Sequence, residues 1–158
     1  MLSNMDRSHD SIQSGLFKTD VYEELYTKAR HLNKLSQSHI NLAHLLMEEG
    51  LSKESLIVAH MAVKMKLKQI YLQSKGALPP EDVFYDDLIC KTRSFAEIDL
   101  ETELFLNTLH YIAETDHEVF LPRIKDGHLE KMFERIEDVL ASLDVCAVSS
   151  SVKIRLEN

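Results

Sequence analysis

Four lysines in one predicted helix form the pattern that most directly suggests chemistry. The helix is expected from about residue 52 to residue 74, and at about 100° per residue four of the five lysines of this segment fall within one sector of about 60°. These are Lys53, Lys64, Lys68 and Lys75, with His60 and Tyr71 at the border of the sector. Such a stripe can hold a phosphate, and the Tyr71 ring offers a surface on which a base can stack. The alternative is a solvated edge, in which the lysine stems cover neighbouring apolar side chains.

Metal chemistry is suggested by one other spacing, Glu114-Thr-Asp-His117. This is the E-x-x-H pattern of di-iron bundles, which also require a second E-x-x-H and two further inward glutamates. No other histidine in the sequence has a glutamate three residues before it. We therefore predict no metal and no cofactor. His39 and His60 lie on apolar stripes, where buried histidines are usually held by hydrogen bonds.

Composition limits the kinds of partner this protein can have. Its 158 residues are enough for one domain, and the formal charge of -8 disfavours nonspecific attraction to DNA or anionic lipid. Any phosphate contact must therefore be local. Cys90 and Cys146 have no CxxC spacing, which favours reduced thiols in a cytoplasm. No segment approaches the roughly 18 apolar residues of a membrane span, so we expect a cytoplasmic protein without membrane contact.

Helical periodicity predicts the elements that position the lysines. Residues 1–18 are polar and aperiodic, and we expect them to form a mobile arm. The tail over 145–158 alternates apolar residues near its end and is expected to be a short strand or to be disordered. Because no strand pattern occurs before it, we predict an all-α, up-and-down bundle of four to five helices over 19–144. The expected helices cover about 20–49, 52–74, 80–92, 97–115 and 126–144.

Two of these helices carry more apolar surface than a simple bundle requires. The helices expected at 52–74 and 97–115 each have apolar residues on two sides. A second apolar side predicts either another helix packed over it or a second subunit, and an isologous homodimer through both helices is the simpler expectation. The alternative is that the helix at 52–74 is the central helix of the bundle.

The segment "EEGLSKESLIVAHMAVKMKLKQIYLQSKGALPP" followed by "FYDDL" resembles the HEPN family, named for nucleotide-binding domains of higher eukaryotes and prokaryotes. The later "FLNTLHYIAETDHEVF" is similar to another helix of that family. The resemblance implies a homodimer, a nucleotide or RNA ligand and often a nucleotidyltransferase encoded beside it, as in toxin–antitoxin pairs. The matching positions are Ala59-His60, Ala62-Val63, Leu67-Lys68, Tyr71-Leu72, Gly76 and Pro79.

The resemblance also suggests functional residues, with some departures from the family pattern. It adds Tyr111 to the ligand-binding set of His60, Lys64, Lys68, Tyr71 and Lys75. Lys64 stands where the family usually has a glutamate. Arg123 and His128 have the spacing of the ribonuclease members, in which the histidine moves a proton at the RNA 2'-hydroxyl and the arginine stabilises the phosphorane. Their alternative role is that of ordinary residues near a helix start.

Three functional hypotheses follow from the sequence. The first is a HEPN-like binding or regulatory module, active as a homodimer and not primarily an enzyme. The second is a metal-independent ribonuclease that uses Arg123 and His128 from each subunit. The third is a helical interaction scaffold, because "INLAHLLMEEGLSKESLIVAHMAVKM" resembles a tetratricopeptide unit. Arrays of that kind repeat at about 34 residues, and the sequence shows no second copy.

Overall fold

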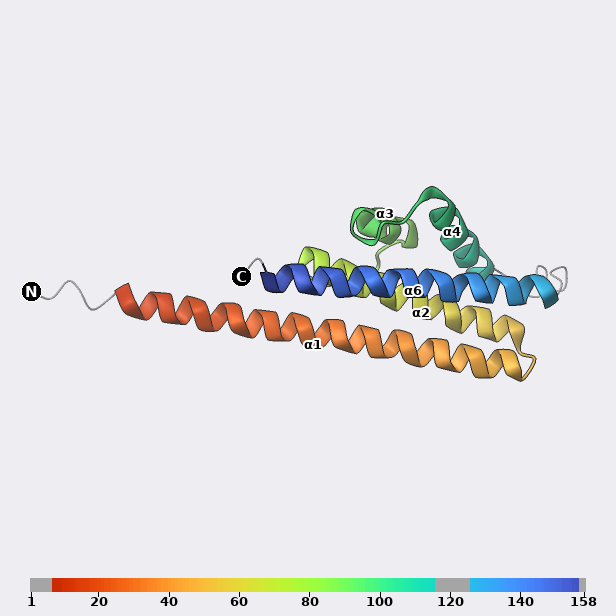
Figure 1. Cartoon of the computed structure of the whole chain (residues 1–158), viewed down its shortest axis with the longest axis horizontal. Coiled ribbons are helices and arrows are strands. Elements are labelled where there is room, and N and C mark those ends of the chain that lie inside the picture. Colours follow the sequence, from red (N-terminus) through yellow and green to blue (C-terminus); the bar gives the residue numbers. More distant parts are fainter. Residues whose placement is uncertain (1–6, 116–125, 157–158) are drawn as a thin grey trace, which may run out of the picture.

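The computed structural model describes residues 7–115 and 126–156, which form a bundle of five helices without strands (Figure 1). The predicted all-α class and number of helices are therefore confirmed for these ranges. The helices are α1 (Arg7–Glu48), α2 (Ser52–Lys75), α3 (Tyr85–Ala96), α4 (Leu100–Glu114) and α6 (Asp126–Leu156).

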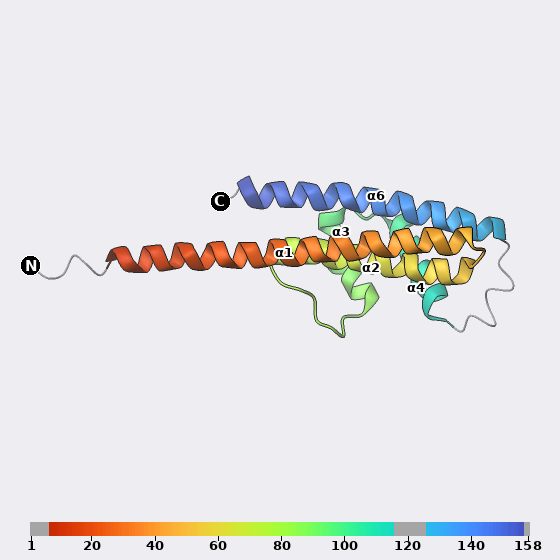
Figure 2. The same ribbon diagram turned by 90° about the horizontal axis from the view of Figure 1, so that it is seen from below.

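Three long helices form the body of the molecule, and two short ones cross it. Helices α1 and α2 are antiparallel, and α6 runs beside them in the same direction as α2 (Figures 1 and 2). Helices α3 and α4 lie across the long helices on one side of them (Figures 1 and 2). The arrangement therefore differs from the predicted up-and-down bundle, because α2 and α6 run parallel and pack against each other, and α3 and α4 connect them in the sequence.

Helix α2 is central, because it packs against α1, α3, α4 and α6. One of its faces supplies the middle of the main core with fully buried apolar side chains. A second face packs on α1 through Leu72, which contacts Ala29 and Leu32. The first face is thus covered within the chain, whereas the second is covered only in part, with Met61 41% exposed. The side chains of the first face are Leu56, Ala59, Val63, Leu67 and Ile70.

The ends of α2 lie where the sequence predicted them. Gly50 and Gly76 have φ of 76° and 74°, in the left-handed region that glycine adopts without a steric penalty. Gly76 donates its backbone N–H to the Leu72 carbonyl, which ends the helix. Helix α3 starts at Tyr85, later than predicted, because the Val83 N–H bonds to the Pro80 carbonyl in a turn. Asp126 begins α6 as expected.

Both outer ends of the chain contain more helix than the sequence predicted. Helix α1 begins at Arg7, so residues 7–18 of the expected arm are helical. Helix α6 continues to Leu156, so most of the expected tail is helical instead of extended. No glycine or proline occurs between His128 and Leu156, and a formed helix gains a hydrogen bond with each added residue. The gain from extending the helix therefore outweighs the weak strand tendency of three alternating apolar residues.

Across the described ranges, none of the helices is both long enough and apolar enough to cross a bilayer. The sequence expectation of no membrane-spanning helix is confirmed to that extent.

Candidate ligand pocket between α2, α3 and α4

A cavity of about 220 Å³ lies where α3 and α4 cross α2. Helix α2 contributes Lys64 and Lys68, and α4 contributes His110 and Glu114. The segment before α3 and its first turn supply the remaining lining residues. These are Glu81, Val83, Phe84, Tyr85 and Leu88. The cavity thus combines cations, carboxylates and aromatic rings from three separate parts of the sequence.

Three aromatic rings pack together beside this cavity. The His60 Nε2 and His110 Nδ1 atoms are 3.2 Å apart, so one ring donates a hydrogen bond to the other. The Tyr85 ring stacks on His110 with ring centres 4.4 Å apart, and its centre is 5.1 Å from that of His60. His60 belongs to the core and is only 2% exposed. The contact therefore links the main core to the cavity.

His60 is held in its neutral form. Burial, and after it the repulsion of a second positive charge by the neighbouring His110 and Lys64, lower the pKa of His60 from 6.5 to about 3. A buried imidazolium would lose its hydration without gaining an anionic partner in direct contact. At neutral pH the ring therefore carries no charge and takes part in the hydrogen bond with His110.

The Tyr85 hydroxyl is buried and has no hydrogen-bond partner among the described residues. Burial, and then the charge of Asp86, raise the pKa of Tyr85, so the hydroxyl keeps its proton. An unsatisfied buried hydroxyl costs about 1–3 kcal/mol in desolvation. Because Tyr85 lines the cavity, this cost is one that a ligand acceptor can relieve.

Charges of both signs face the cavity. The Lys64 Nζ atom lies 3.9 Å from a Glu114 carboxylate oxygen, at the limit of an ion pair. Lys68 also lines the cavity, and Glu81 is the second carboxylate there. A half-exposed ion pair of this length contributes at most about 1 kcal/mol. Lys64 can therefore exchange Glu114 for another anion at small cost.

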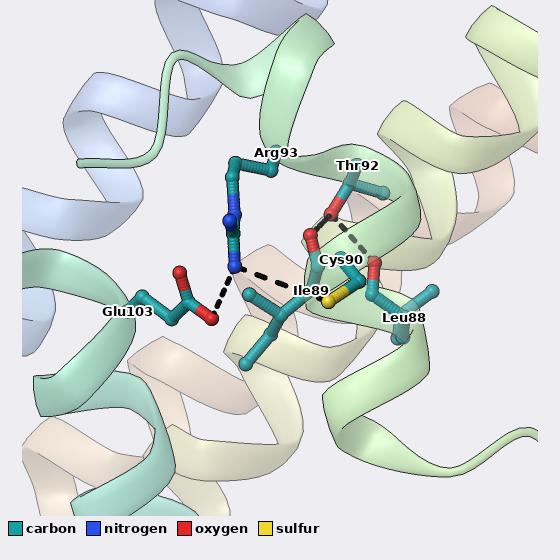
Figure 3. Close-up of polar contacts among 6 residues, drawn as sticks. All are labelled: Leu88, Ile89, Cys90, Thr92, Arg93 and Glu103. Atoms are coloured by element: carbon teal, nitrogen blue, oxygen red, sulfur yellow. Dashed lines mark hydrogen bonds and ion pairs between the residues drawn. The ribbon is translucent and has the colours of Figure 1, made fainter. Parts of the chain in front are cut away.

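An ion pair joins α3 to α4, the helices that carry Tyr85 and His110. The Arg93 guanidinium of α3 donates to the Glu103 carboxylate of α4 at 2.5 Å, and it also approaches the Cys90 sulfur at 3.9 Å (Figure 3). The Thr92 hydroxyl donates to the Leu88 carbonyl at 2.7 Å, and the Ile89 carbonyl lies 3.2 Å away (Figure 3). These bonds satisfy polar groups at the crossing.

The first turn of α4 is fixed by a cap. The Asp99 carboxylate accepts the Thr102 backbone N–H at 2.8 Å, which satisfies one of the free donors of the helix start. The hydrogen bonds with Thr102 lower the pKa of Asp99. The sequence expectation placed this helix start close by, near residue 97, and the capping aspartate accounts for the observed position.

The structure brings together three of the predicted ligand-binding residues. Lys64 and Lys68 line the cavity, and His60 contacts His110 at its edge. Tyr71 instead packs against the main core. Lys75 lies over the Phe95 ring, 5.3 Å from its centre, and Tyr111 is exposed on α4 without lining the cavity.

The predicted ribonuclease pair is only half described. His128 is exposed near the start of α6 and does not line the cavity, whereas Arg123 lies outside the described residues. His117 of the E-x-x-H spacing also lies outside them, while Glu114 is a lining residue.

Sequence reasoning missed Tyr85 and His110 as site residues. His110 and Glu114 are four residues apart, so the sequence alone predicts that they lie on the same side of their helix. Their meeting with His60, which is 50 residues away, depends on how the helices cross.

A second cavity, of about 200 Å³, lies between α1 and α6 and contains Lys66. Lys66 is 3% exposed, makes an ion pair with Asp144 and donates to Gln69 at 3.1 Å. On the helical wheel it lies on the opposite side from the lysine stripe, next to the apolar face. These contacts identify Lys66 as a structural cation that joins α2 to α6.

No protein-family model and no curated protein matches this chain.

Proposed function

We propose that the protein is a HEPN-like binding module that holds a nucleotide in the cavity between α2, α3 and α4. The observation that carries the proposal is the presence of Lys64, Lys68 and an exposed Phe84 around one cavity. The lysines provide charge for a phosphate, and the aromatic ring provides a face for a base.

The phosphate end of the ligand is assigned to the two lysines. They are four residues apart on α2 and therefore share one side of the helix, as the predicted stripe required. The protein as a whole carries a formal charge of -8, so this local pair supplies attraction that the rest of the surface does not. His110, between them and Tyr85, adds a hydrogen-bonding imidazole.

The base end is assigned to Phe84, which is 77% exposed. A phenylalanine with this exposure contributes little to the stability of the fold, whereas its stacking on a base would stabilise a complex by about 1–3 kcal/mol. The sequence had suggested Tyr71 for this role, but Tyr71 packs against the core. The buried Tyr85 hydroxyl adds a hydrogen-bond donor at the cavity wall.

Binding of AMP, ATP and a short single-stranded RNA by titration calorimetry tests this proposal. We expect Lys68→Ala and Phe84→Ala each to weaken nucleotide binding about tenfold, because each removes roughly 1.4 kcal/mol of contact. Lys131→Ala, at an exposed lysine of α6, is the matched control and should leave the dissociation constant unchanged. Equal binding by all variants would overturn the proposal, and binding of RNA alone would assign the site to RNA.

The homodimer is part of the same proposal. The second face of α2 is covered by α1 only in part, with Met61 41% exposed, and α4 leaves a row of apolar side chains exposed: Leu100, Leu104 and Tyr111. We infer that a second copy packs on this row, which belongs to the same helix as His110. The nucleotidyltransferase partner rests on the family resemblance alone and stays a prediction.

A further inference from the structure

We propose that His60, His110 and Glu114 form a binding site for a divalent transition metal of the zinc type. The site goes beyond the proposed nucleotide function, because neither lysine nor Phe84 takes part in it. One ligand comes from α2 and two come from successive turns of α4.

The distances between the candidate ligand atoms suit a single ion. One ligand atom from each residue lies within 4.8 Å of those of the other two. Zinc binds imidazole nitrogens at about 2.0–2.1 Å, so two nitrogens on one tetrahedral ion are about 3.3 Å apart. The His60 and His110 nitrogens are 3.2 Å apart. The two rings are therefore already at the separation that chelation requires.

The third ligand has the freedom to close the site. Glu114 is exposed, and among the described residues its carboxylate is held by a single ion pair, the 3.9 Å contact to Lys64. Rotation of this side chain can shorten its distance to the two nitrogens without moving either helix. His60 is the rigid ligand of the site, since its side chain is packed in the core.

The donor set indicates which metals fit. Two imidazoles and one carboxylate are the ligands of several zinc enzymes, and they leave one coordination position open. Nitrogen ligands favour zinc, copper or nickel over magnesium and calcium, which prefer oxygen. Burial favours the neutral imidazole, which is the form that binds a metal. His110 and Glu114 also line the cavity, so a bound ion would be accessible from it.

Sequence reasoning predicted no metal because it looked for paired E-x-x-H motifs. The candidate set instead has an H-x-x-x-E spacing on one helix and a single histidine on another. Lys64 lowers the affinity for the metal, because its ammonium competes with the ion for the Glu114 carboxylate. Lys64→Gln should therefore strengthen metal binding while weakening phosphate binding, which separates this proposal from the nucleotide proposal.

Titration of the chelator-treated full chain with Co²⁺, followed by displacement with Zn²⁺, tests the site. We expect one ion per chain and the intense visible absorption of four-coordinate Co²⁺. His110→Ala and Glu114→Gln should each weaken binding by at least about 100-fold, beyond the 10–100-fold usually lost with an outer-shell partner. Because Glu114 is exposed, its substitution tests the site without disturbing the core.

The matched control is His44→Ala. The His44 Nε2 atom lies 2.6 Å from a Glu137 carboxylate oxygen, and this pair has no third metal ligand close to it among the residues that the structure describes. This variant should bind Co²⁺ like the wild type. Binding that survives both His110→Ala and Glu114→Gln, or that weakens in Lys64→Gln, would overturn the proposal. Weak absorption typical of six-coordinate Co²⁺ would do the same.

Discussion

At the scale of single residues, His60 occupies the position that the sequence predicted for a core histidine. It lies on the apolar face of α2, as expected of a core histidine, and its Nε2 atom meets His110 at the cavity edge. Its position could be predicted because it depends only on the period of one helix. Its partner could not, because His110 lies on α4 and the crossing of α2 and α4 has no signature in local sequence.

The low pKa of His60 makes stability depend on pH in the metal-free protein. The unfolded chain binds a proton at His60 below about pH 6.5, whereas the folded chain does so only near pH 3. Stability is therefore full above pH 6.5 and is lost as pH falls. Between pH 6.5 and pH 5 this group should remove about 2 kcal/mol from the free energy of unfolding.

Urea denaturation at several pH values measures that loss. The groups around His60 are Lys64 on α2, Tyr85 on α3, and His110 and Glu114 on α4. His60→Gln should remove most of the decrease, because it removes the proton that only the unfolded state binds. His31→Gln, at an exposed position of α1, should keep it. If the free energy of unfolding falls with pH equally in His60→Gln and in the wild type, this explanation is wrong.

At the scale of elements, local signals were sufficient wherever a helix ends at a breaker. Gly50 and Gly76 fix the ends of α1 and α2, and the wheel of α2 predicted its fully buried face. The start of α1 and the end of α6 were missed because no such breaker lies there. The residues that α2 contributes to the candidate site could be predicted from its own sequence. Those of α3 and α4 could not, because they depend on how these helices cross α2.

The contact between α2 and α6 depends on a buried charge. The Lys66 ammonium is buried and pairs with Asp144, which is half exposed. Asp144→Ala should lower the free energy of unfolding by about 2–4 kcal/mol, because it leaves a buried cation without its anion. Adding Lys66→Met should restore most of that loss, since a buried pair replaced by an apolar side chain is often neutral.

Chemical denaturation of the two single variants and the double variant gives the coupling energy. Asp138→Ala, at an exposed aspartate of the same helix, serves as the control and should change stability by less than about 0.5 kcal/mol. A double variant less stable than Asp144→Ala alone would show that Lys66 stabilises the fold by other contacts.

At the scale of the whole molecule, the exposed row on α4 predicts self-association. Leu104 is 59% exposed, and burying such a side chain stabilises an interface by about 1.5–3 kcal/mol. Sedimentation should show a dimer at micromolar concentration, and Leu104→Glu should shift it to a monomer. Leu45→Glu on α1, where the leucine is 60% exposed, is the matched control. A monomeric wild type would contradict the dimer.

The central claim is that the nucleotide binds between α2, α3 and α4. The eight histidines of the chain are natural reporters, because several of them mark competing sites. His60 and His110 mark this cavity, His44 marks the one between α1 and α6, and His128 marks the ribonuclease hypothesis.

Imidazole resonances recorded by NMR during a titration with ATP locate the ligand directly. We predict that the resonances of His110, and to a smaller extent those of His60, shift with ATP concentration while those of His44 and His128 stay fixed. Shifts confined to His44 or His128, or no histidine shift at saturating ATP, would contradict the account.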